Sequence, residues 1–175
     1  MPTKGIDYRT ISLRDALDLA VLIEEEAKER YLELADQMEL HHTPDAEGFF
    51  RFMADNEDKH RVELLERRHK LFDHQPSGVT REQLFDVEAP DYSEARVFMT
   101  PREALETALR SETKAWTFFD KVLPQLVDLG VRGLFEELRA EEVHHQELVR
   151  RELAKLPPDD AFCHEDFADE PVGQD

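Results

Sequence analysis

Apolar residues recur at steps of three and four along four long segments of the chain, which predicts four amphipathic helices. The predicted helices run from about Ser12 to Leu40, from Pro44 to Phe72, from Pro101 to Val127 and from Val131 to Leu156. Thr100 and Glu103 form a capping-box pattern at the start of the third helix. Pro124 should kink that helix or end it a turn early, because proline lacks the backbone N–H that a helix interior needs.

The segments between the predicted helices restrict how the helices can be arranged. The first two helices are joined around residues 41–43 and the last two by Leu129–Gly130, so each pair should be antiparallel neighbours. Residues 73–100 are long enough to run back along a helix before the third one begins. We therefore expect an all-α, ferritin-like antiparallel four-helix bundle over residues 1–156, with one long crossover between its second and third helices. Residues 157–175 are rich in proline and acidic residues and should form a disordered tail.

One glutamate lies in the middle of the apolar stripe of each predicted helix. In the first helix, for example, Glu24 follows Ala20 and precedes Ala27 at helical spacing. A buried carboxylate costs several kcal/mol unless something compensates its charge, and no lysine or arginine lies at the centre of these stripes. Two divalent cations would balance the four carboxylates in charge and would also accept imidazole ligands.

Two of the helices also carry a histidine three residues after the glutamate, a spacing at which both side chains reach the same face. A glutamate from each of two helices, with Glu-x-x-His from each of the other two, is the ligand set of dinuclear carboxylate bundles. The predicted metal ligands are therefore Glu24, Glu57, His60, Glu112, Glu142 and His145. A second register on the fourth helix, Glu141 with His144, is disfavoured because helical phase places Glu141 off the stripe and His144 well away from its centre.

The two halves of the chain also repeat each other. Glu24 corresponds to Glu112 at an offset of 88 residues, and Glu57 corresponds to Glu142 at an offset of 85 residues. The predicted ligands of the two halves coincide in this alignment without being forced to. The difference between the two offsets falls in the hairpin loop, where changes of length are tolerated.

With these motifs the chain resembles the rubrerythrin-like branch of the ferritin-like superfamily. The matching stretches are Glu24 with Ala27 and Tyr31, residues 50–60, Glu112, and residues 135–145. The resemblance implies a centre of two iron ions that reacts with hydrogen peroxide or oxygen. The ligand types themselves do not separate iron from manganese or from a mixed pair.

The hypothesis that follows assigns a role to each predicted ligand. The bridging ligands would be Glu57 and Glu142, the terminal ligands Glu24 and Glu112, and the histidines that bind one metal each His60 and His145. Tyr31 lies two turns from Glu24 on the same helix face, so its hydroxyl could hydrogen-bond a ligand carboxylate. The alternative for Tyr31 is an ordinary core tyrosine.

The chain departs from rubrerythrin in two respects. Rubrerythrin carries a cysteine-rich rubredoxin-like domain for electron delivery, whereas this chain has one cysteine, Cys163, so its electron donor should be a separate protein. Rubrerythrin also has an additional carboxylate on its third core helix, where this chain has Ala115 or Leu109, depending on the alignment. Members of the family are commonly dimers, which makes a homodimer the expected assembly.

The charge of the chain excludes several kinds of partner. Lys and Arg number 22 and Asp and Glu 41, giving a net charge of −19, which argues against nucleic acid and anionic membranes as partners. The best apolar stretch, Leu19–Ile23, is far too short to span a bilayer. The chain does not start with a basic and then apolar segment, so we expect a cytoplasmic location.

Two functions therefore compete. The first is a di-iron oxidoreductase that reduces hydrogen peroxide or oxygen. The second is an iron-binding or ferroxidase protein that takes up, stores or delivers iron without an organic substrate. A quinone hydroxylase with the same ligands would need an apolar membrane-facing surface, which this charged chain argues against, and a metal-free interaction bundle leaves the four in-stripe glutamates unexplained.

Overall fold

The structure is a computed structural model, and it describes residues 5–84 and 99–157. Its main helices are α1 (Leu13–Leu40), α2 (Pro44–Phe72), α3 (Pro101–Val122) and α4 (Leu129–Leu153), with two short 3-10 helices, η1 (Arg81–Gln83) and η2 (Leu123–Gln125). No strand occurs within these described residues, so the predicted all-α class is confirmed.

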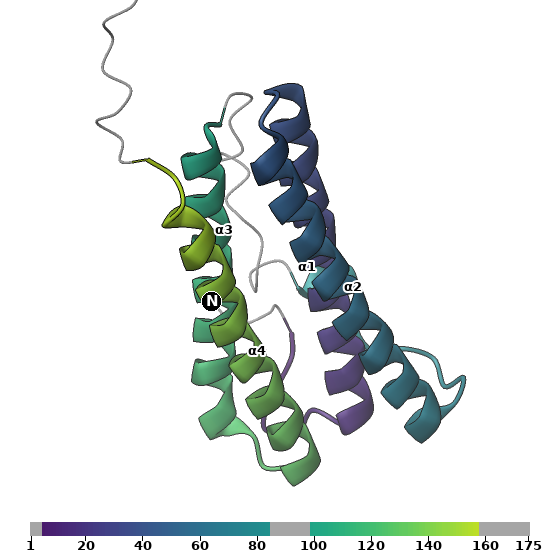
Figure 1. The fold of residues 1–175 in the computed structure, drawn as a ribbon. Helices are drawn as coiled ribbons and strands as arrows, with labels where there is room; N and C mark the ends of the chain where they lie inside the picture. The colour runs from purple at the N-terminus through teal and green to yellow at the C-terminus, as the bar shows by residue number, and fades with distance from the viewer. Residues whose placement is uncertain (1–4, 85–98, 158–175) are drawn as a thin grey trace, which may run out of the picture.

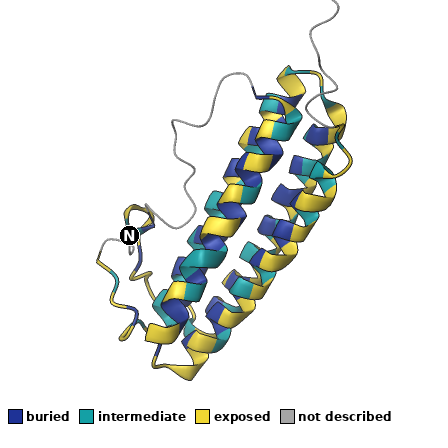
Figure 2. Ribbon diagram, turned by 90° about the vertical axis from the view of Figure 1, so that its left-hand side faces the viewer, coloured by how far each residue is buried: buried dark blue, intermediate teal, exposed yellow. Residues whose placement is uncertain are grey.

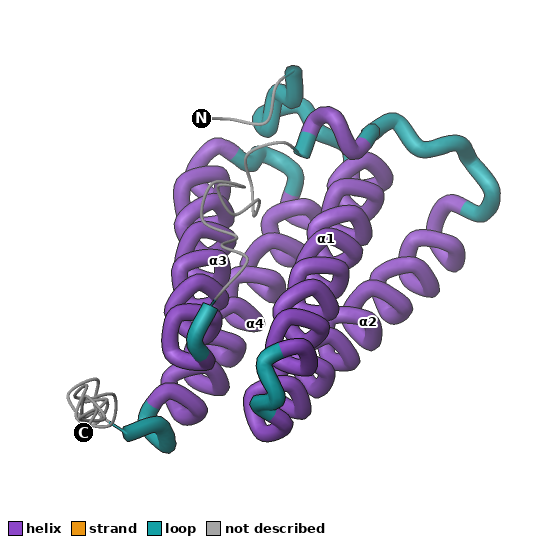
Figure 3. Tube along the Cα trace, turned by 90° about the horizontal axis from the view of Figure 1, so that it is seen from above, coloured by secondary structure: helices purple, strands orange, loops and turns teal. Residues whose placement is uncertain are grey.

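The four helices form two antiparallel hairpins. α1 pairs with α2 and α3 pairs with α4, and the two hairpins lie side by side (Figure 1). The view from above shows the same pairing (Figure 3). The first hairpin turns at residues 41–43, as predicted, and His42 there has a φ of 55°, in the left-handed region. The ferritin-like bundle expected from the helix pattern is thus the observed fold.

α3 is shorter than the predicted range Pro101–Val127. The helix ends at Val122 instead of Val127, which is the early end that Pro124 allowed. The chain tightens at that point into the 3-10 helix η2, in which Pro124 needs no intrahelical partner for its missing N–H.

The start and end of α4 correct the sequence prediction. Leu129–Gly130 was predicted as the link but lies inside the helix. The Asp128 side chain accepts a hydrogen bond of 2.9 Å from the backbone N–H of Val131, so α4 is capped at Asp128 and begins two residues earlier than predicted. The link is therefore residues 126–128. At the other end, α4 stops at Leu153, and residues 154–156 continue as a turn.

Buried apolar side chains form two clusters, one on each side of the middle of the bundle. The first includes Leu17, Phe119 and Phe135, and the second includes Met38 and Phe50. In every helix the in-stripe glutamate lies in sequence between members of the two clusters. Figure 2 shows buried positions along the whole length of the helices. The two clusters place packed apolar residues on both sides of the polar middle.

The crossover is fixed to the bundle at its beginning. Arg68 of α2 is buried and pairs with Asp18 of α1 at 2.8 Å, and it also donates to the backbone carbonyls of Asp73 and Gln75. The rest of the predicted crossover, residues 85–98, lies outside the described residues, as does the predicted acidic tail after Pro157. No helix within the described part of the chain has the length and apolar character needed to cross a membrane.

Candidate metal centre

All of the sequence-predicted ligands lie together between the two apolar clusters. α1 contributes Glu24, α2 contributes Glu57 and His60, α3 contributes Glu112, and α4 contributes Glu142 and His145. The four glutamates and His145 are buried, whereas His60 is only partly buried. The convergence follows from helical phase, because each residue occupies the inward stripe of its own helix at the same level of the bundle.

Glu57 lies between the two histidines. Its Oε1 is 3.3 Å from Nδ1 of His145, and its Oε2 is 4.0 Å from Nδ1 of His60. The two imidazole rings stack with their centroids 5.4 Å apart and 13° between their planes. One carboxylate thus presents one oxygen to each histidine, which is the arrangement that a bridging ligand needs.

The ligand atoms separate into two half-sites on either side of Glu57. Within each, every residue offers a ligand atom that lies within 4.8 Å of the others. We name the first the outer half-site, and it consists of Glu24, His60 and Glu141. We name the second the inner half-site, and it consists of Glu112, Glu142 and His145. Glu57 forms a third such group with the two histidines and so connects the two half-sites.

The donor atoms fit divalent metal ions. The set contains only carboxylate oxygens and imidazole nitrogens, which suit iron, manganese and zinc. Nδ1 of His60 is buried and makes no hydrogen bond to any described residue, yet three carboxylate oxygens lie 3.9 to 4.0 Å from it. A metal ion bound among these carboxylates would give this buried nitrogen a partner.

The two half-sites differ electrostatically. Burial raises the pKa of Glu24 to about 7, although a hydrogen bond with Glu57 acts in the opposite direction. Burial also acts to raise the pKa of Glu112, but contacts with His145 and hydrogen bonds with Glu142 and Tyr31 lower it below its usual value. Burial acts to lower the pKa of His145, but the carboxylates of Glu112, Glu24 and Glu141 together outweigh it, so that this pKa is raised. The inner half-site therefore favours a carboxylate–imidazolium pair, while Glu24 in the outer half-site favours its neutral form.

Tyr31 accounts for part of this difference. Its hydroxyl donates a hydrogen bond to Oε1 of Glu112, and burial together with that carboxylate raises the pKa of Tyr31 well above its usual value, so the phenol stays protonated. The repeat aligns Tyr31 with Phe119, which has no hydroxyl to offer Glu24. The tyrosine thus lies where the sequence prediction placed it, against one of the proposed ligand carboxylates.

Glu141 is the residue that sequence reasoning missed. The Glu141–His144 register was disfavoured as a pair, and His144 is indeed exposed, but Oε2 of Glu141 lies 3.9 Å from Nδ1 of His60. Its position next to Glu142, at the edge of the stripe, could have indicated this, because a long side chain at the edge of a helix face can still reach the core. Gln146 was also missed, and it is buried with its Nε2 donating to the Glu112 carbonyl at 3.4 Å.

The raised pKa of Glu24 makes the stability of the protein pH-dependent after its metal is removed by chelation. The carboxyl titrates at about 7 in the fold and near 4.5 in the unfolded chain, so the folded state binds more protons between these values. The stabilisation is complete at acid pH and is lost as the pH rises, by about 2–3 kcal/mol between roughly pH 5 and pH 8. Urea unfolding of the chelated protein at several pH values measures this slope, and Glu24→Gln should flatten it. An equal slope in the parent and the variant would contradict the assignment.

Comparison with known proteins identifies the family of the chain. The rubrerythrin family model matches residues 15–153. The chain is also similar to an uncharacterised conserved protein of Magnetospirillum magnetotacticum MS-1, whose crystal structure matches with a TM-score of 0.71 and 28% sequence identity, over 85% of this chain and 97% of that one. No curated protein matches. Since the family model covers the whole bundle, the chain belongs to the rubrerythrin family.

Proposed function

We propose that this protein binds two iron ions between its helices and uses them to reduce hydrogen peroxide or oxygen. The observation that carries the proposal is the position of Glu57, with one carboxylate oxygen toward each of the two histidines. The family match and the three ligand groups support a dinuclear metal centre. The choice of iron over manganese and the reaction itself rest on the family resemblance.

The candidate ligands can be assigned to two ions. His60 and Glu24 would bind the outer ion, and His145 and Glu112 the inner ion, with Glu57 shared between them. Glu142, which the sequence hypothesis made a second bridging ligand, lies with the inner group. Two Fe(II) ions supply the two electrons that convert hydrogen peroxide to water or oxygen to peroxide. The two apolar clusters limit water at the ends of the centre, and the Tyr31 hydroxyl fixes the orientation of Glu112.

Sustained turnover needs a supply of electrons and of substrate. The chain has a single cysteine and therefore no rubredoxin-like site, so we propose that a separate donor protein re-reduces the centre. Peroxide and oxygen are small enough to approach along the partly exposed His60 side. A homodimer is proposed as the assembly on the basis of the family alone.

Iron handling is the second candidate function. It is favoured by a pocket of about 160 Å³ that reaches His60 from the surface and has Glu63, Glu137 and Glu141 among its lining residues. Acidic side chains along an opening attract cations from solution. A protein that oxidises iron and passes it on would use such an opening for the metal itself.

Metal analysis followed by a peroxide assay tests the proposal. Protein purified without chelators should contain about two metal ions per chain, the stoichiometry of a dinuclear bundle site. With excess peroxide and ascorbate, the Fe(II)-loaded protein should consume many equivalents of peroxide per centre, whereas chelated protein should consume none. One oxidation without further turnover would favour iron handling. A chain that binds no metal even after anaerobic incubation with Fe(II) would overturn both functions.

A further inference from the structure

We propose that Glu141 is a ligand of the outer metal ion, and that this outer ion exchanges with solvent while the inner one stays bound. The inference rests on the proposed dinuclear centre and adds a ligand to it. It also predicts that the two ions are held unequally.

The geometry around His60 supports Glu141 as a ligand of the outer ion. Its buried Nδ1 has three carboxylate oxygens at nearly the same distance, from Glu24 at 3.9 Å, Glu57 at 4.0 Å and Glu141 at 3.9 Å. These distances are too long for hydrogen bonds. Two ligand atoms that each bind one ion at about 2.0–2.2 Å lie roughly 3–3.6 Å apart, so each carboxylate needs to move by less than about 1 Å to share an ion with His60. Glu141 therefore has the same relation to His60 as the two carboxylates already assigned to the centre.

The repeat shows that Glu141 is specific to the outer half-site. At the offset of 85 residues that aligns Glu57 with Glu142, Glu141 corresponds to Asn56. An amide carries no charge, so the inner half-site gains no equivalent carboxylate from α2. The additional carboxylate thus makes the two half-sites unequal in their ligands.

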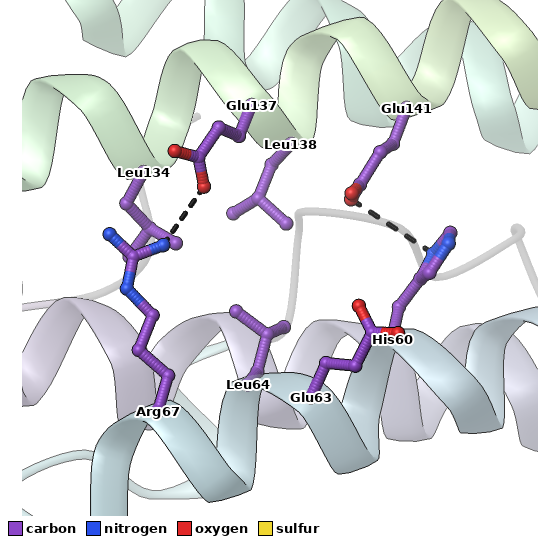
Figure 4. A pocket seen from close by; sticks show the side chains of 8 residues that line it. All are labelled: His60, Glu63, Leu64, Arg67, Leu134, Glu137, Leu138 and Glu141. Carbon is purple, nitrogen blue, oxygen red and sulfur yellow. Dashed lines mark hydrogen bonds and ion pairs between the residues drawn. The ribbon is translucent and has the colours of Figure 1, made fainter. Parts of the chain in front are cut away.

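The surface pocket supports the exchange of the outer ion with solvent. Figure 4 shows Glu141 directed at His60, with Glu63 beside His60 and Glu137 paired to Arg67. Arg67 is the one permanently cationic residue among those that line the pocket, and its ion pair with Glu137, at 2.9 Å, neutralises it. Glu63 and Glu141 are left to give the opening a negative charge, which suits the passage of a divalent cation.

Among the described residues, the inner half-site is more enclosed than the outer one. The His145 side chain is 3% exposed, whereas that of His60 is 24% exposed. Glu112 is held by the Tyr31 hydroxyl, and its backbone carbonyl accepts a hydrogen bond from Gln146. An ion bound there can leave only if packed side chains move, so its release is slower than that of the outer ion.

Cobalt binding to the full-length chain tests the proposal without any catalytic assay. The metal-free protein is titrated with Co²⁺, followed by visible absorption, and is then challenged with excess EDTA. The parent should bind two Co²⁺ ions and release them in a fast and a slow phase. Glu141→Gln should weaken one binding step and accelerate the fast phase by at least about 10-fold, the usual lower limit for losing a group that supports a metal site. The slow phase should not change.

Glu147→Gln is the matched control, because it removes an exposed carboxylate from the same helix outside the pocket. It should leave both binding steps as in the parent. The same binding steps and release phases in Glu141→Gln as in the parent would overturn the proposal and leave the dinuclear centre intact. A parent that binds fewer than two ions would instead overturn the proposed function. If Glu141→Gln does not fold, Glu141→Asp applies the same test, because its shorter side chain withdraws the oxygen from His60.

Discussion

Replacing Glu57 with glutamine is expected to remove both metal ions, the largest loss that any single substitution in the centre should cause. Glu57 has one oxygen toward each histidine, and an amide supplies neither the second anionic oxygen nor the charge. Glu24→Gln should be milder and lose mainly the outer ion, because Glu24 belongs to one half-site only. Metal content per chain after dialysis against a weak chelator measures both variants.

The control is Asp58→Asn, on the next residue of the same helix. The Asp58 side chain is 36% exposed and pairs with Lys28 and Arg61 at the surface, so its loss should leave the metal content unchanged. Circular dichroism of each variant establishes that the helices are intact. Two ions per chain in Glu57→Gln would show that this carboxylate does not bridge them, and one ion would assign it to a single half-site.

The helices and the convergence of the main candidate ligands were predictable because both depend on local periodicity. The α2 bounds, Pro44–Phe72, are those that the apolar pattern and the proline at the first helical position predicted. Glu24, Glu57, Glu112 and Glu142 stand out since a charged residue in an apolar stripe needs a physical explanation. Signals of this kind are carried by residues a few positions apart, which a single sequence displays directly.

The features that were not predictable depend on contacts between distant segments. The distance between Glu141 and His60 depends on how the hairpins pack, and helical phase alone placed Glu141 off the stripe. The Asp128 cap of α4 is by contrast a local contact over three residues, and an aspartate at that position is a sequence signal for the start of a helix. The inequality of the two half-sites also follows from packing, since the repeat by itself suggests two equal ones.

Replacing Arg68 with alanine is expected to destabilise the fold by about 3–5 kcal/mol, because it leaves the charge of Asp18 buried and unpaired. Both side chains in this pair are only 10% exposed. The same guanidinium also donates to the carbonyls of Asp73 and Gln75, which holds the first residues after α2 against the bundle. Arg68→Lys should recover only part of the loss, since an ammonium group cannot reproduce the bidentate contact with Asp18.

Arg67 provides the matched comparison, as it is the neighbouring residue and of the same type. Its ion pair with Glu137 is at the surface, where the two side chains are 39% and 61% exposed, so Arg67→Ala should cost less than about 1 kcal/mol. Urea unfolding of the two alanine variants, with the metal removed from both, measures the contrast. Equal midpoints and slopes would mean that the Asp18 charge finds water or another partner when Arg68 is absent. A large difference between these adjacent arginines would show that burial decides what such an ion pair contributes, and that the start of the crossover is held by the bundle through Arg68.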